Sequence, residues 1–67
     1  MYNTDLHSHW EIYVNGVVYG VRADKRSAIS LAFKKVTKSN KVDIVCIKGD
    51  SLMTTDSWIN GKRNRFA

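Results

Sequence analysis

The sequence predicts a small α+β domain with two layers, in which a single helix packs on one face of a sheet. Three observations predict it: an Asn-Gly pair between alternating β-forming residues, one segment with a helical period, and one short run of β-branched residues. Their order is strand, strand, helix, strand, with a fourth short strand after them, a ββαβ(β) arrangement. The 67 residues make one domain, near the lower limit for a core without disulfides or metals.

The segment 10–22 predicts the hairpin. Asn15-Gly16 suits a type I′ turn, because both central residues of that turn need a positive φ. The resulting register pairs Val14 with Val17 and puts six residues on one face: Trp10, Ile12, Val14, Val17, Tyr19 and Val21. The opposite face would hold His9, Glu11, Tyr13, Val18, Gly20 and Arg22. Gly20 is expected to weaken the second strand and to mark a bulge near its end.

The segment 24–40 predicts the helix. Asp24 suits the N-cap and Asn40 suits the left-handed residue that ends a helix. The spacing i, i+3, i+4, i+7 predicts a buried stripe of Ile29, Ala32, Phe33 and Val36. The opposite side would carry Ser27, Leu31, Lys34 and Lys38. An exposed Leu31 there is either an ordinary surface leucine or the centre of a contact.

The remaining chain predicts one or two further strands. Residues 41–48 have apolar side chains on both faces, as a central strand does, and Leu52–Thr55 would pair back as an edge strand. Whether the third strand joins in parallel or antiparallel stays open, and parallel pairing beside the first strand would need a right-handed crossover. Asp56 and Ser57 would cap a helical turn that places Trp58 in the core. Residues 1–8 are expected to be a loose lead-in and residues 62–67 a flexible basic tail.

The positive charge is unevenly distributed. The formal net charge is +5. Residues 22–41 contribute seven cations against Asp24, for +6, and residues 57–67 contribute three cations, for +3. Residues 1–21 and 42–56 each carry −2. Such clustering indicates an anionic partner more strongly than a uniform basic bias would.

Two function classes fit this pattern. The first is nucleic-acid binding by a small non-enzymatic protein through the basic helix side and tail: Arg26, Ser27, Leu31, Lys34, Lys38, Lys62, Arg63 and Arg65. The alternative is a protein-interaction module, a small inhibitor or adaptor of a larger cytosolic protein. It would dock Leu31 with its lysine rim on an acidic surface, or use the exposed edge strand, which also offers a route to a homodimer.

An enzyme, a cofactor and a membrane location are not expected. No carboxylate pairs with a histidine or cysteine in a catalytic pattern. Asp5, His7 and His9 share one face if extended and form a weak metal candidate, against the simpler interpretation of a polar terminus. The lone Cys46 lies in an apolar run, which predicts a buried thiol in a reduced, cytoplasmic protein. No apolar stretch reaches membrane-spanning length, so a soluble protein is expected.

Overall fold

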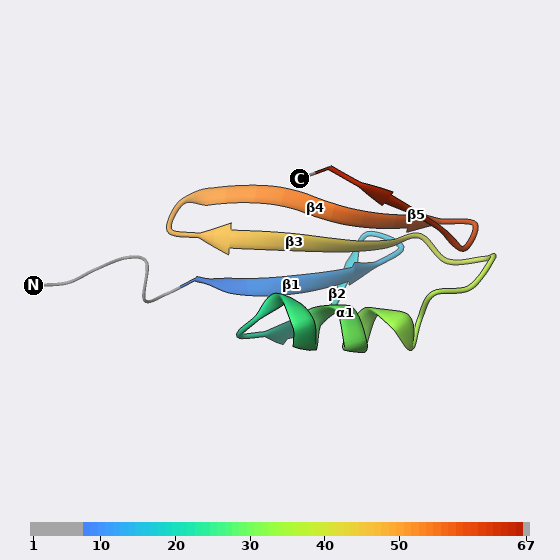
Figure 1. The fold of residues 1–67 in the computed structure, drawn as a ribbon, viewed down its shortest axis with the longest axis horizontal. Helices are drawn as coiled ribbons and strands as arrows, with labels where there is room; N and C mark the ends of the chain where they lie inside the picture. The colour runs from blue at the N-terminus through green and yellow to red at the C-terminus, as the bar shows by residue number, and fades with distance from the viewer. Residues whose placement is uncertain (1–7, 67) are drawn as a thin grey trace, which may run out of the picture.

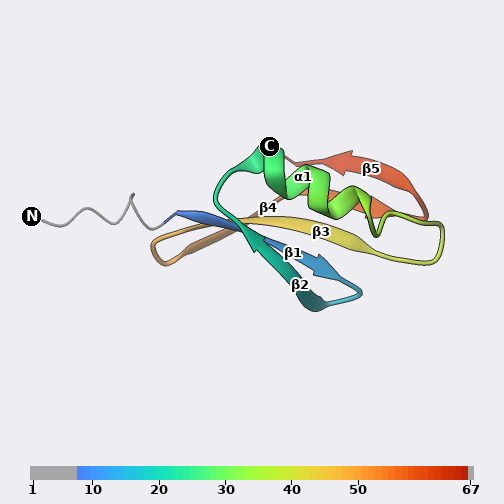
Figure 2. The same cartoon turned by 90° about the horizontal axis from the view of Figure 1, so that it is seen from below.

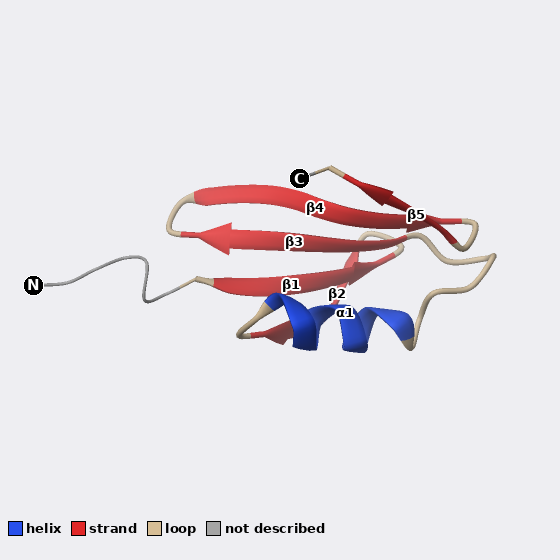
Figure 3. Ribbon diagram, viewed as in Figure 1, coloured by secondary structure: helices blue, strands red, loops and turns tan. Residues whose placement is uncertain are grey.

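The computed structural model describes residues 8–66 and has one helix and five strands in an α+β arrangement (Figures 1 and 3). The elements are β1 (His9–Val14), β2 (Val17–Arg22), α1 (Lys25–Phe33), β3 (Val42–Lys48), β4 (Ser51–Ile59) and β5 (Lys62–Arg65). The predicted fold class is therefore confirmed, with both strands expected after the helix present and a further strand, β5, after them.

The strands form one antiparallel sheet in the order β2-β1-β3-β4-β5. Three tight hairpins join neighbouring strands, and α1 carries the chain from the edge strand β2 across to β3, which lies beside β1. The pairing of β3 with β1 is antiparallel, which settles the point that the sequence left open. The helix covers one face of the sheet, where it packs over β1, β2 and β3 (Figure 2). We call this the helix face and the other side the open face.

The β1–β2 hairpin keeps the predicted turn but not the whole predicted register. Asn15 and Gly16 have φ values of 54° and 85°, as the type I′ turn requires. Val14 pairs with Val17 as predicted, but a bulge at Tyr19 then pairs Ile12 with Gly20 and Trp10 with Arg22.

The predicted pairs of Ile12 with Tyr19 and of Trp10 with Val21 are therefore wrong. A bulge places two residues of one strand opposite a single residue of its partner, so the alternation beyond it is inverted. Gly20 and Arg22 lie on the helix face, and Val21 turns to the open face with 47% of its surface exposed.

A second bulge lies in the same row of the sheet. The register of β3 with β4 shifts after Ile44, which pairs with Asp56, so Thr55 is the extra residue. Ile12 and Ile44 pair with each other in the centre of this row. The two bulges therefore flank the same pair of fully buried isoleucines, and each turns its strand beside the helix.

The helix begins where the sequence predicts and ends earlier. Asp24 is the N-cap, with extended backbone and a carboxylate that accepts from the Ser27 N–H at 2.8 Å. The last helical residue is Phe33, not a residue beside Asn40. Beyond it, local bonds replace the helical ones: the Ser39 N–H donates to Thr37 Oγ1 at 3.3 Å, and Asn40 Nδ2 donates to the Lys35 carbonyl at 3.0 Å. Short polar side chains compete with a helix in this way.

The buried side of α1 matches the predicted stripe only in part: Ala32 is fully buried, and Ile29 and Val36 pack partly buried against the core. Ala28, Leu31 and Ala32 face the sheet, Ile29 is partly buried, and Phe33 is 55% exposed. Small alanines let the helix approach closely, and the absence of a side chain on Gly20 makes room for Leu31. A Cβ built on Gly20 would lie 2.5 Å from Leu31 Cδ2. The expectation of an exposed Leu31 is therefore wrong, since only 8% of it is exposed.

The core lies between the helix and the central strands. It consists of Ile12, Ala28, Leu31, Ala32, Val42, Ile44 and Trp58. Trp58 is buried as predicted, with Phe33 edge-on to it at a centroid distance of 5.5 Å. It reaches this place from β4 and not from the expected helical turn, because β4 runs through to Ile59.

The C-terminal segment also differs from the expected tail. Lys62–Arg65 form β5, which pairs with Asp56–Ile59 through a turn at Asn60 and Gly61. Both turn residues have positive φ, 56° and 81°, so this Asn-Gly pair makes the same type of hairpin turn as the first. The basic residues of this segment are thus held in the sheet.

Candidate functional site

A basic groove lies between α1 and the end of β2. It has a volume of about 360 Å³ and is lined by Arg22, Arg26, Ser27, Ser30, Leu31 and Lys34. Leu31 forms its apolar floor, since that side chain is almost fully buried. All the other lining residues are exposed polar or cationic groups, and none is acidic. The groove is therefore suited to an anion.

Two elements supply these side chains. Arg26, Ser30 and Lys34 are four residues apart, which places them in one row along the helix with about 6 Å of rise between neighbours. Arg22 comes from β2, and it reaches the helix face only because the bulge at Tyr19 inverts the alternation of that strand. In the regular register that the sequence suggests, Arg22 would lie on the opposite face.

The cations of the groove have no carboxylate partner within residues 8–66. Arg26 and Lys34 form no ion pair there, and Arg22 donates to the carbonyl oxygen of Val21 at 2.7 Å. The nearby Asp24 is occupied by the helix cap. The backbone N–H of Ser27 lowers the pKa of Asp24 below its ordinary value of 3.8, with a smaller contribution from Arg26. Three positive charges therefore converge on the groove, and of these only Arg26 is offset by a nearby carboxylate, that of Asp24.

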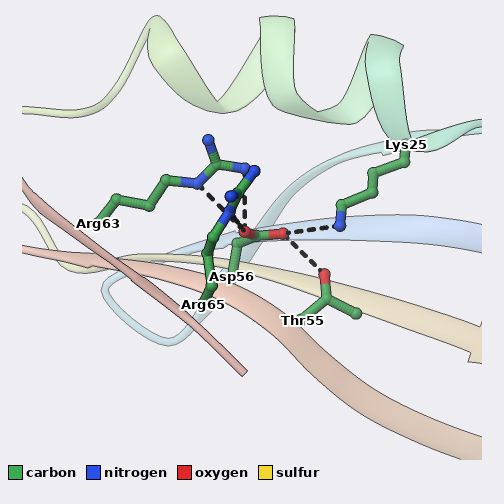
Figure 4. Close-up of polar contacts among 5 residues, drawn as sticks. All are labelled: Lys25, Thr55, Asp56, Arg63 and Arg65. Atoms are coloured by element: carbon green, nitrogen blue, oxygen red, sulfur yellow. Dashed lines mark hydrogen bonds and ion pairs between the residues drawn. The ribbon is translucent and has the colours of Figure 1, made fainter. Parts of the chain in front are cut away.

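A second cluster of charge lies on the other flank of the helix, around the buried carboxylate of Asp56 (Figure 4). Arg63 donates to Asp56 Oδ1 from Nε at 3.1 Å and from Nη2 at 3.0 Å. Thr55 Oγ1 donates to Oδ2 at 3.0 Å, and Lys25 Nζ lies 3.4 Å from the same oxygen. Arg65 Nε lies 4.0 Å from Oδ1. Three cations thus share one carboxylate, which leaves an excess of positive charge beside the helix.

The environment of Asp56 keeps it ionised. Burial alone would raise the pKa of this carboxyl, but the hydrogen bonds from Thr55 and Arg63 and the charge of Lys25 outweigh it and lower the pKa below 3.8. Arg63 also lies over the Trp58 ring, with Cζ 5.2 Å from the ring centroid. Arg63 is therefore first a structural residue, which holds β5 against the core.

The structure separates the residues that the sequence grouped together. Arg26, Ser27, Leu31 and Lys34 meet in the groove. Lys38 lies in the loop after the helix, and Lys62 points to the open face because it alternates with Arg63. Arg63 and Arg65 lie on the other flank of α1. The sequence offers Ser30 as a polar contact on the helix but does not place Arg22 beside it, and the one signal for Arg22 was the bulge expected near Gly20.

The open face carries a hydrogen-bonded trio on β1. Tyr13 Oη donates to Glu11 Oε1 at 2.8 Å, and His9 Nε2 lies 3.3 Å from Glu11 Oε2. The hydrogen bond to Glu11 raises the pKa of Tyr13 above its ordinary value of 10.0. Two members of the weak metal candidate, Asp5 and His7, lie outside the described residues. Within residues 8–66, no three potential metal ligands come together. Cys46 is half-buried, not fully buried as expected.

No helix in residues 8–66 has the length and apolar character needed to cross a bilayer. No protein-family model, no curated protein and no solved structure matches this chain.

Proposed function

We propose that this protein binds nucleic acid, without catalysing a reaction, through backbone phosphates held in the basic groove. One observation carries the proposal: Arg22, Arg26 and Lys34 converge on one groove that contains no carboxylate. Uncompensated cations on a rigid surface are what phosphate binding requires, because they release counterions from the nucleic acid. The hydroxyls of Ser27 and Ser30 add donors for phosphate oxygens.

The second flank of the helix would extend the same contact. Lys25, Arg63 and Arg65 exceed the charge of Asp56, so the positive field continues on the side of α1 away from the groove. Contacts of this kind position a protein on the backbone and do not read sequence. We therefore expect binding with little sequence preference.

Titration by fluorescence anisotropy tests the proposal, with a short labelled duplex and its single strand at several salt concentrations. Arg26→Ala and Lys34→Ala each remove one phosphate contact. Each should reduce the slope of log K against log salt by about 0.9 for duplex DNA, or about 0.7 for a single strand. Lys62→Ala is the matched control, since it removes one exposed lysine from the open face and should leave the slope unchanged.

Two results would contradict the groove as the site. One is binding by the unaltered protein that does not weaken with salt. The other is a loss on Lys62→Ala as large as the loss on Lys34→Ala, which would mean that net charge alone determines affinity.

The alternative of docking through Leu31 loses its basis, because the side chain is buried against Gly20. A cytoplasmic location remains our proposal from the single Cys46, which has no cysteine to pair with in this chain.

A further inference from the structure

The outer edge of β4 is only partly covered. The strand runs over Ser51–Ile59, and β5 pairs with its second half, Asp56–Ile59. The Phe66 N–H donates to the Thr55 carbonyl at 2.9 Å, and no described strand pairs with the outer side beyond that bond. Residues 51–54 therefore pair with β3 alone and present their other edge to solvent.

This stretch has no charged side chain or proline to protect its edge, and the bulge of β4 lies just beyond it, at Thr55. Folded proteins protect their edge strands with charged side chains, proline or bulges. The edge strand β2 has the bulge at Tyr19 and ends in Arg22, and β5 carries Lys62, Arg63 and Arg65. Residues 51–54, Ser-Leu-Met-Thr, carry no charge and no proline. Leu52 is 71% exposed and Met53 is 57% exposed, on opposite faces of the sheet.

The helix leaves this end of the sheet free. The β3–β4 hairpin extends past the first turn of α1 in both views (Figures 1 and 2). The helix packs over β1, β2 and β3, and its contacts with β4 lie in the second half of that strand, at Asp56 and Trp58. A second strand added at residues 51–54 would meet no obstruction from α1.

We propose that a second copy of this chain pairs with residues 51–54 through antiparallel strand addition about a two-fold axis. Antiparallel pairing of identical strands is self-complementary, so the same segment serves both partners. Charge favours this segment over the rest of the surface, because two copies with a net charge of +5 repel each other where their cations face. An uncharged edge brings no like charges together. The two Leu52 side chains would cover each other on one face of the joined sheet, and the two Met53 side chains on the other.

Sedimentation velocity over micromolar to millimolar protein tests this proposal. The unaltered chain should show a reversible monomer–dimer equilibrium. Leu52→Lys places two like charges beside the two-fold axis and should raise the dimer dissociation constant by about tenfold or more. The matched control is Val17→Lys on the other edge strand, where the replaced valine is 69% exposed, and it should leave the equilibrium unchanged. Circular dichroism establishes that both variants fold.

Hydrogen exchange supplies a readout at the proposed edge itself. Protection of amides in residues 51–54 should rise with protein concentration in the unaltered chain and not in Leu52→Lys. A chain that stays monomeric at millimolar concentration would overturn the proposal, and so would a dimer that Leu52→Lys leaves intact. The proposal does not depend on nucleic-acid binding, so a monomeric Leu52→Lys variant that still binds DNA is consistent with it.

Discussion

At the residue scale, the contact between Gly20 and Leu31 determines how closely the helix lies on the sheet. Gly20 contributes no side chain, and the terminal methyl of Leu31 occupies the space where a Cβ would be. A glycine within a strand carries a conformational cost of roughly 0.5–1 kcal/mol relative to alanine. Overpacking a core costs more, about 1–3 kcal/mol. The close approach therefore outweighs the entropic disadvantage of glycine at this position.

Gly20→Ala tests this balance. We expect a loss of about 1 kcal/mol in the free energy of unfolding, measured by urea denaturation, because Leu31 must shift towards the groove. In a Leu31→Ala background the same substitution should be neutral or stabilising, since the methyl that it meets is gone. An equal loss in both backgrounds would mean that the cost arises from the β2 backbone and not from this contact.

Asp56 makes the free energy of unfolding depend on pH in the acidic range. The pKa of Asp56 is lower in the folded state than its unfolded-state value of about 3.8. Its stabilisation of the folded state is therefore complete above about pH 3.8 and is lost as the pH falls through the folded-state pKa. Asp56→Asn should cost roughly 2 kcal/mol at neutral pH, less than a fully buried pair, because Lys25 and Arg63 are 39% and 29% exposed. It should also flatten the decline in stability as the pH falls below about 4.

Asp50→Asn is the control for this measurement, because Asp50 is an exposed carboxylate in the β3–β4 turn. Its stability profile should follow that of the unaltered protein. An unchanged acid decline in Asp56→Asn would show that other carboxylates are responsible.

At the scale of the elements, the starts of strands and of the helix are predictable and the ends are less so. Asn15-Gly16 and Asp24 act through their own backbone geometry, so the first hairpin and the helix start follow from local sequence. The helix end depends on Asn40, which lies beyond it and bonds back to the Lys35 carbonyl. Its rotation depends on Gly20 in another strand, a tertiary constraint that a hydrophobic period does not contain.

The strand β5 shows why composition misleads at a terminus. Its basic residues resemble a solvated tail, but Arg63 is held by Asp56 and Trp58. Arg63→Ala should lower the free energy of unfolding by about 2 kcal/mol, because it leaves Asp56 buried with fewer partners. Amides of residues 62–65 should then exchange faster with solvent. Lys62→Ala, on the same strand, should change stability by less than about 0.5 kcal/mol. If the two variants behave alike, the side-chain contacts do not hold the strand.

At the scale of the whole molecule, the charge is arranged on both flanks of one helix. Arg22, Arg26 and Lys34 lie on one side of α1, and Lys25, Arg63 and Arg65 lie on the other. The sequence predicts that residues 22–41 and the C-terminal segment are basic, which is a property of composition. It does not predict which of these cations lie close together in the fold. That depends on the two bulges and on the carboxylate of Asp56, around which Lys25, Arg63 and Arg65 gather.

The two bulges also determine where the chain tolerates a change in length. Tyr19 and Thr55 are each the extra residue of a bulge, so removal of either would leave the pairing on both sides in register. A deletion at another position in β2 or β4 would instead exchange the faces of every residue up to the next turn. The chain can therefore lose a residue at position 19 with least consequence, whereas the loss of Thr55 would also remove its hydrogen bond to Asp56. Deletions in related chains should therefore gather at position 19 as well as in the loops.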